Sequence, residues 1–258
     1  MSARLPLAID TGGLELPETG LVSVLHPGAT TDFSALPMAQ IEVVQPFKPD
    51  FDHFHALGYS TVPSSDVTCS AAVVCLPRAK ALSRALIASA CQRSTGLVII
   101  DGSKTDGIDS MLKECRKRVE VFGPVAKSHG KLFWFDADPT AFADWQASSQ
   151  TIGDYTTAPG VFSADGIDPA SDLLGQALPA KLGKNVVDLG AGWGYLSAQV
   201  LPKHPEIETL HLVEAEAVAL DCARQNVTDP RAKFHWADVS RWQTPQLLDG
   251  VIMNPPFH

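Results

Sequence analysis

The stretch VVDLGAGWGYL, residues 186–196, decides the fold of the segment that carries it. Asn185–Leu189 is a short apolar run, typical of a buried strand. A turn with three glycines follows, and the chain then continues with helical character over Tyr195–Leu201. Such a turn lets the backbone approach a ligand closely and leaves free N–H groups at a helix N-terminus. The stretch therefore predicts an α/β unit that binds a ligand at this turn.

The spacing and charge of the turn indicate which ligand it takes. Dinucleotide-binding turns have the pattern G-x-G-x-x-G, whereas Gly190, Gly192 and Gly194 give G-x-G-x-G. The strand also ends with an acid, Asp188. A carboxylate here would repel a pyrophosphate but attract the cationic amino-acid end of S-adenosylmethionine. The turn therefore favours S-adenosylmethionine as the cofactor.

Two further acids follow the next two predicted strands. Leu210–Val213 is the second strand and leads into Glu214, where an acidic side chain accepts hydrogen bonds from ribose hydroxyls. The alternative for Glu214 is an ordinary acid at the start of the helix Ala215–Asn226. Phe234–Trp236 is the third strand, and Asp238 soon after it can accept from the adenine amino group. Both acids are therefore predicted to bind the cofactor.

The fourth predicted strand, Leu248–Met253, runs into the sequence NPPF. The side-chain oxygen of Asn254 and the carbonyl of Pro255 can accept both hydrogens of a planar amine, which directs the nitrogen lone pair toward an electrophile. Phe257 can stack on the base that bears the amine, and the prolines stiffen the loop. A plain proline-rich turn is the alternative. In this context Asn254, Pro255 and Phe257 are predicted to hold a methyl acceptor.

The first half of the chain repeats the α/β pattern without a glycine-rich turn. Helices are predicted over Pro77–Arg93 and over 107–119, the second with Ile108, Met111, Leu112 and Cys115 on its inward face. Alternation of strands with helices indicates a mostly parallel sheet covered by helices. The small, polar stretch Ala147–Asp154 marks the boundary, which gives domains 1–150 and 151–258. The strands predicted in the first domain are Leu21–Leu25, Ile41–Val44, Ala71–Leu76, Leu97–Ile100 and Lys131–Phe135.

Composition narrows the class of protein. The 258 residues carry a net charge of −9, which argues against a protein that coats nucleic acid non-specifically. Local basic patches remain possible over Arg78–Arg84 and Lys113–Arg118. The alternative for these clusters is a solvated helix face. The five cysteines lack C-x-x-C spacing, so no zinc site is predicted. The histidines and aspartates of PDFDHFH, residues 49–55, are not accompanied by a further cluster of metal-ligating residues, so no other metal site is predicted. With neither a signal-like start nor a long apolar run, the sequence predicts a cytoplasmic location and no membrane partner.

The motifs DLGAGWG, LVEAEAVALDCARQN, ADV and MNPPFH, in this order, resemble class I methyltransferases that methylate amino groups. The chain is most similar to the bacterial ribosomal RNA (guanine-N2)-methyltransferases of the RsmC/RlmG type. Pro159–Ser163 with Ile167 and Asp168 resembles the segment before their cofactor strand, while LPRAKALSRALI, DGSKTDGIDS and VAKSHGKLFWF resemble their first domain. The resemblance implies two Rossmann-like methyltransferase-fold domains, of which the first is degenerate, does not bind cofactor and helps to hold RNA.

The resemblance also implies roles for single residues. Asp188, Gly190 and Gly192 would line the methionine end of the cofactor, Glu214 its ribose and Asp238 its adenine, with Phe162 and Ser163 nearby. Asn254, Pro255 and Phe257 would hold the target guanine amine. The family continues for several strands after NPPF, so we expect the sequence to be a fragment, or its fourth strand to be covered by a partner chain or the first domain. The expected partner is ribosomal RNA or a ribosomal subunit; oligomeric state is not predicted.

Two alternatives to guanine-N2 methylation remain open at this point. N-P-P-aromatic sequences also serve adenine-N6 and protein glutamine methylation, because each of these substrates presents a planar amine. A third hypothesis is an inactive, truncated RNA-binding module that keeps the cofactor turn without turnover.

Overall fold

The computed structural model describes residues 4–11 and 13–255, and the chain divides into two compact units. The first unit comprises Met1–Pro46 and Asp50–Ala147, and the second comprises Phe47–Pro49 and Ser148–His258. Each unit has its own central sheet and its own hydrophobic core. Among the described residues, every helix is too short or too polar to cross a membrane.

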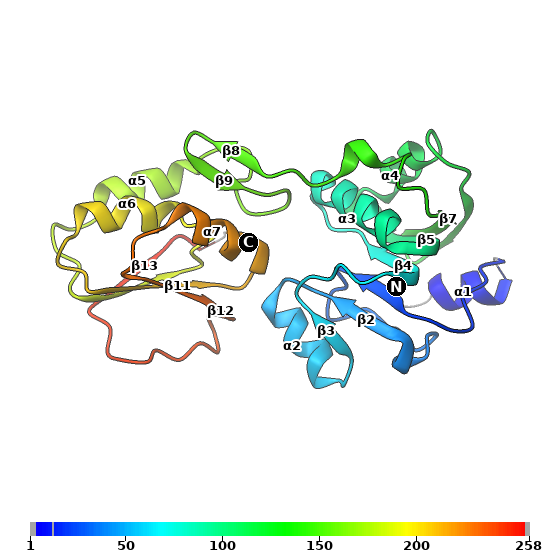
Figure 1. Cartoon of the computed structure of the whole chain (residues 1–258), viewed down its shortest axis with the longest axis horizontal. Coiled ribbons are helices and arrows are strands. Elements are labelled where there is room, and N and C mark those ends of the chain that lie inside the picture. Colours follow the sequence, from blue (N-terminus) through cyan, green and yellow to red (C-terminus); the bar gives the residue numbers. More distant parts are fainter. Residues whose placement is uncertain (1–3, 12, 256–258) are drawn as a thin grey trace. The chain divides into compact units, whose positions relative to one another are not determined.

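The sheet of the first unit has the order β3-β2-β1-β4-β5-β7-β6 within the described residues (Figure 1). β7 runs antiparallel to both of its neighbours, and the remaining pairs are parallel, which confirms the predicted mostly parallel sheet. The short β3 and the Pro-containing β6 were not predicted. The strands are β1 (Val22–Leu25), β2 (Ile41–Val44), β3 (Ser60–Val62), β4 (Cys69–Cys75), β5 (Ser94–Ser103), β6 (Phe122–Lys127) and β7 (Gly130–Asp136).

Helices cover both faces of this sheet, because its strands are apolar on both sides. Along β5, Val98 and Ile100 pack into the core under α3 and α4, while Ile99 between them packs into the core that contains Leu5 of α1. This alternation follows from the two-residue period of a strand. The helices are α1 (Arg4–Thr11), α2 (Lys48–Ala56), α3 (Lys80–Arg93) and α4 (Ile108–Cys115), with 3-10 turns η1 (Met38–Gln40), η2 (Lys104–Asp106) and η3 (Ala143–Trp145).

The predicted helix over Pro77–Arg93 begins three residues later than expected, at Lys80. Ala79 has extended backbone angles (φ −72°, ψ 108°), so Pro77 belongs to the connection after β4 and does not occupy the first helical position. The second predicted helix begins at Ile108 after Gly107 in the left-handed region, and it ends at Cys115 instead of Val119. Its predicted inward side chains are all buried; they are Ile108, Met111, Leu112 and Cys115.

A buried ion pair ties the C-terminal end of α3 to strands β1 and β2 of the sheet. The Arg93 guanidinium donates to Glu42 Oε1 at 3.1 Å and to Ser23 Oγ at 2.9 Å. Ser65 donates to the other Glu42 oxygen at 2.9 Å, so both carboxylate oxygens are occupied. The Arg93 and Glu42 side chains are 8% and 9% exposed. Removal of one partner from such a pair leaves an uncompensated buried charge.

We therefore expect Glu42→Ala to lower the free energy of unfolding by about 3–5 kcal/mol. Urea unfolding followed by circular dichroism measures this change. The matched control is Glu208→Ala, because Glu208 pairs with Lys184 at 2.6 Å while both side chains are more than half exposed. That variant should lose less than about 1 kcal/mol. Equal losses in the two variants would contradict the argument from burial.

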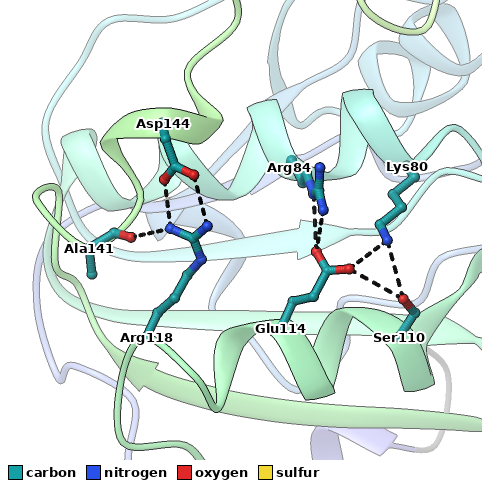
Figure 2. A network of polar contacts seen from close by, with 7 residues as sticks. All are labelled: Lys80, Arg84, Ser110, Glu114, Arg118, Ala141 and Asp144. Atoms are coloured by element: carbon teal, nitrogen blue, oxygen red, sulfur yellow. Dashed lines mark hydrogen bonds and ion pairs between the residues drawn. The ribbon is translucent and has the colours of Figure 1, made fainter.

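Several cations of the two basic clusters are engaged in ion pairs within the first unit (Figure 2). Glu114 of α4 accepts from Arg84 of α3 at 2.8 Å and pairs with Lys80. Arg118 donates to both carboxylate oxygens of Asp144, at 2.6 and 2.8 Å, and to the Ala141 carbonyl. These cations connect α3, α4 and η3, so their charges are paired within the first unit.

The second unit begins with a two-stranded antiparallel hairpin, followed by a parallel sheet of order β12-β11-β10-β13 in the described residues (Figure 1). β13 lies at the edge of this sheet, and its Val251 and Met253 are exposed. The strands are β8 (Gln150–Ile152), β9 (Tyr155–Thr157), β10 (Asn185–Leu189), β11 (Thr209–Glu214), β12 (Ala232–Trp236) and β13 (Gly250–Met253); the helices are α5 (Pro169–Ala177), α6 (Tyr195–Lys203) and α7 (Ala217–Asn226).

The two sheets share one strand order, since β3-β2-β1-β4 and β12-β11-β10-β13 both place the first strand between the second and the fourth. This repeat confirms the expected α/β class, with the same Rossmann-like strand order present in both sheets of the described residues. The chain after β1 reads His26-Pro27-Gly28, where β10 is followed by the glycine turn. After β4 it reads Leu76-Pro77-Arg78, where β13 is followed by Asn254. The first unit therefore has neither the glycine turn nor an asparagine at the two corresponding positions.

Candidate active site

The turn from β10 to α6 has an open face and a packed face. Gly190 and Gly192 have positive φ values of 71° and 56°, and a Cβ placed on either would meet nothing within 4 Å. Gly194, with φ 87°, lies against α7, and a Cβ there would stand 2.9 Å from Val227 Cγ2 and 3.1 Å from Ala223 Cβ. The third glycine thus allows close helix packing, while the first two leave space over the backbone for a ligand.

Asp188, the acid at the end of β10, is almost completely buried beneath this turn. Its side chain accepts a hydrogen bond from Ser197 Oγ of α6 at 2.7 Å through Oδ2. Oδ1 is buried and has no hydrogen-bond partner among the described residues. Burial raises the pKa of the Asp188 carboxyl to about 6, and the charge of Glu214 adds to this effect. A buried acceptor without a partner is suited to a cationic or hydrogen-bond-donating ligand.

Glu214, at the end of β11, is bonded to the glycine turn. One carboxylate oxygen accepts from the Gly192 N–H at 2.8 Å, and the other accepts from the Glu216 N–H at 2.8 Å. Desolvation and the neighbouring Glu214 charge raise the pKa of Glu216 to about 7. Three acids therefore surround the carboxyl ends of β10 and β11, an arrangement that disfavours an anionic ligand and favours a cationic one.

Asn254 follows β13, which pairs with β10 so that Met253 lies opposite Leu189. This register brings Asn254 beside the first glycine of the turn. The Asn254 amide nitrogen donates to Asp168 Oδ2 and to Ser171 Oγ, both at 2.8 Å. Asp168 and Ser171 belong to the first turn of α5, where Asp168 is the N-cap residue.

One pocket unites most of these groups. The Phe162 carbonyl accepts a hydrogen bond from Trp193 Nε1 at 3.0 Å, which ties the segment before α5 to the glycine turn. Tyr195 donates to Asp172 at 2.7 Å on the same side of α6. The pocket is lined by Phe162, Ser163, Asp168, Ser171, Gly190, Ala191, Gly192, Trp193, Tyr195, Leu196 and Asn254.

The structure brings together most of the residues predicted from the sequence. Phe162, Ser163, Gly190, Gly192 and Asn254 line the pocket directly, and Asp188 and Glu214 lie next to its glycine turn. The remaining three predicted residues are not part of this lining, as described next. Their roles, like those of the other site residues, stay predictions.

Asp238, Pro255 and Phe257 contribute differently. Asp238 lies two residues beyond β12, where its Oδ1 accepts from the Ser240 backbone N–H at 2.8 Å and from the Ser240 hydroxyl at 2.7 Å. These bonds lower the pKa of the Asp238 carboxyl. Pro255 is exposed, and Phe257 lies outside the described residues. The described residues contain no group of three or more acidic, histidine or cysteine side chains that could hold a metal ion.

No local sequence pattern predicts the contact of Asp168 and Ser171 with Asn254. Asp168 precedes Pro169, a pattern typical of a helix start. Asp168 also belongs to the segment that resembles the region before the cofactor strand in the related family. Its partner Asn254 is 86 residues away, so only the folded chain shows the contact.

Comparison with known proteins shows what the second unit is similar to. Residues 153–258 match the family described as "Methyltransferase small domain". The chain is 34% identical over 173 residues to the ribosomal RNA small subunit methyltransferase C of Erwinia tasmaniensis, covering 64% of this chain and 45% of the relative. It is 31% identical over 199 residues to the protein of that name from Shewanella pealeana, covering 72% and 58%. The chain thus spans about half the length of these curated relatives.

A solved structure extends the likeness to both units. It is a T. thermophilus 16S rRNA N2 methyltransferase in complex with AdoMet and guanosine. The two chains are 24% identical with a TM-score of 0.74, and the match covers 95% of this chain and 72% of that one. At this identity, the likeness shows a common fold.

Proposed function

Since the chain is a relative of the ribosomal RNA small subunit methyltransferases C, and its residues 153–258 match the methyltransferase small domain, we propose that it methylates the exocyclic N2 amine of a guanine in ribosomal RNA with S-adenosylmethionine. The observation that carries the proposal is the position of Asn254, beside the glycine turn in one pocket. Its amide N–H groups are bonded to Asp168 and Ser171, which leaves its oxygen to accept from a substrate amine.

The residues present fit the cofactor. The unpartnered Oδ1 of Asp188 and the neighbouring acids favour the positively charged methionine end. The open face of Gly190 and Gly192 gives room for a close approach to the backbone. Glu214 would hold the ribose and Asp238 the adenine, with Phe162 and Ser163 close by. When bound, S-adenosylmethionine supplies the electrophilic methyl group.

The protein groups act mainly by orientation. Asn254 Oδ1 would accept one hydrogen of the guanine amine and the Pro255 carbonyl the other, which turns the nitrogen lone pair toward the methyl group. Phe257 would stack on the base. Holding the reacting atoms in a near-attack geometry supplies much of the rate enhancement in transfers of this kind. The proton that leaves the methylated nitrogen passes to water.

The proposed partner is ribosomal RNA, free or assembled in a subunit, encountered in the cytoplasm. Because the acceptor amine is recessed within a duplex, the base would be turned out of its stack into the pocket. Exposed cations of the first unit outside the ion pairs of Figure 2, such as Lys113 and Lys117, support a role of that unit in holding RNA.

Analysis of the methylated product tests this proposal. The full chain is incubated with S-adenosylmethionine that carries a labelled methyl group. The substrate is either naked ribosomal RNA or small subunits, both taken from cells whose ribosomal RNA lacks this methylation. We expect N2-methylguanosine in the nucleoside digest by mass spectrometry. Label in N6-methyladenosine or in protein glutamine would instead identify adenine or glutamine as the substrate and contradict the proposal. RNA binding without transfer and without S-adenosylmethionine binding in calorimetry would favour the inactive RNA-binding module.

A further inference from the structure

The amide of Asn254 is held by two groups of one helical turn. Asp168 Oδ2 accepts from the Asn254 amide nitrogen at 2.8 Å and from the Ser171 backbone N–H at 2.7 Å. Ser171 Oγ accepts from the same amide nitrogen at 2.8 Å. Asp168 therefore performs two tasks, since it caps α5 and binds the side chain that follows β13.

These contacts determine which end of the amide a ligand meets. A carboxamide has two N–H donors and one acceptor oxygen. Both Asn254 donors are directed at Asp168 and Ser171, and no described residue donates to its oxygen. An ionised carboxylate can only accept hydrogen bonds, so it excludes the reversed amide orientation. The Ser171 N–H and the Asn254 amide lower the pKa of the Asp168 carboxyl, which keeps it ionised at neutral pH.

We propose that Asp168 is a positioning residue that fixes Asn254 with its amide oxygen toward the pocket, and thereby makes the pocket select a base with an exocyclic amine over one without it. The inference rests on the proposed function of Asn254 as the group that binds the acceptor. A reversed amide would present N–H groups to the pocket and would favour a carbonyl. The orientation is thus a specificity element supplied by α5, far away in sequence from the NPPF loop.

A capping role alone is the competing explanation, and Asp168→Ser separates the two. Serine caps helices about as well as aspartate, but its shorter side chain offers no carboxylate to Asn254. Asp168→Asn is the conservative variant, because its oxygen can take the place of Oδ2 in both bonds. Gln176→Ala is the control on the same helix, since Gln176 is exposed and its side chain donates a hydrogen bond to Asp172, not to Asp168, Ser171 or Asn254.

The first measurement reads the contact directly and does not depend on turnover. Side-chain amide signals of Asn254 in the full chain are followed by ¹⁵N NMR. We expect slowed hydrogen exchange in the wild type and in Gln176→Ala, and faster exchange, by about tenfold or more, in Asp168→Ser. Unchanged exchange in Asp168→Ser would overturn the proposed positioning.

The second measurement reads selectivity with nucleosides. Guanosine and inosine differ by the exocyclic N2 amine, so their affinities for the chain with S-adenosylhomocysteine, measured by saturation-transfer NMR, test the pocket. We expect the wild type and Gln176→Ala to prefer guanosine by about tenfold. Asp168→Ser should lose this preference although its melting temperature is unchanged, and Asp168→Asn should restore the preference in part. A preference that survives in Asp168→Ser would overturn the inference. If the wild type shows slow exchange without any preference, the guanine assignment fails and the contact stands.

Discussion

Replacement of Asn254 with alanine is expected to reduce methyl transfer by about 100-fold or more while cofactor affinity changes by less than about threefold. The reason is spatial. Asn254 contacts Asp168 and Ser171, whereas the acidic groups proposed to hold the cofactor surround the other side of the glycine turn. Single-turnover transfer to ribosomal RNA and calorimetry with S-adenosylmethionine measure the two quantities separately.

Asn254→Asp sharpens this prediction. The substitution keeps an oxygen that could accept from the amine, but it removes both donors and places a second carboxylate beside Asp168. Like charges at hydrogen-bond distance repel strongly or force protonation, so this variant should also lose transfer. Gln246→Ala, at an exposed position in the loop before β13, should keep both activities. Transfer that survives in Asn254→Ala together with a collapse of cofactor affinity would contradict the assigned role.

Elements whose own residues form a clear apolar pattern were predicted well. Asn185–Leu189 was predicted with its observed bounds, and β1 and β2 were predicted within one residue, because apolar β-branched side chains that are buried on both faces leave a clear signal. The inward face of α4 was also correct, since its four apolar side chains stand at helical spacing. Local pattern and tertiary environment agree at these positions.

Elements that depend on their neighbours were missed. β3 consists of only three residues, Ser60–Val62, and is held by pairing with β2, so it is too short to leave a recognisable pattern in the sequence. β6 contains Gly123 and Pro124, two residues depleted in strands, and it lies at the edge of the sheet, where proline is tolerated. In both cases the sheet supplies the conformation, and a single sequence does not reveal the partner strand.

The site shows the same division. The glycine turn, Asp188 and Glu214 follow predicted strands directly, so parallel strand order alone brings them to one edge. The contact of Asp168 with Asn254 needs the docking of α5 on the sheet, which no local pattern encodes. The capping of Ser240 by Asp238 is likewise visible only in the folded loop.

Asp188→Asn is expected to make the protein more stable at neutral pH and at the same time to weaken cofactor binding. Burial raises the pKa of the Asp188 carboxyl from 3.8 to about 6. A raised folded-state pKa means that the folded protein holds the proton more tightly than the unfolded chain does. The contribution of this group to the free energy of unfolding is therefore fully present below about pH 3.8 and is lost as the pH rises through 6. At about 1.4 kcal/mol per pKa unit, the ionised carboxylate costs roughly 3 kcal/mol at pH 7.5.

The difference between variant and wild type therefore has a defined pH dependence. In urea unfolding, the stability gain of Asp188→Asn should be small near pH 4, should grow between pH 4 and 6, and should be constant above pH 7. Calorimetry should show at least about a tenfold loss of affinity for S-adenosylmethionine, because the amide lacks the charge that we propose to attract the cationic methionine end. Ser197→Ala is the control, because it removes the hydrogen bond to Oδ2 while Asp188 stays in place. This variant should raise the pKa of Asp188 further and should make the folded protein less stable at neutral pH. A less stable Asp188→Asn at pH 7.5 would mean that the buried Oδ1 is satisfied without ligand, and the argument that it is reserved for a cation would fail.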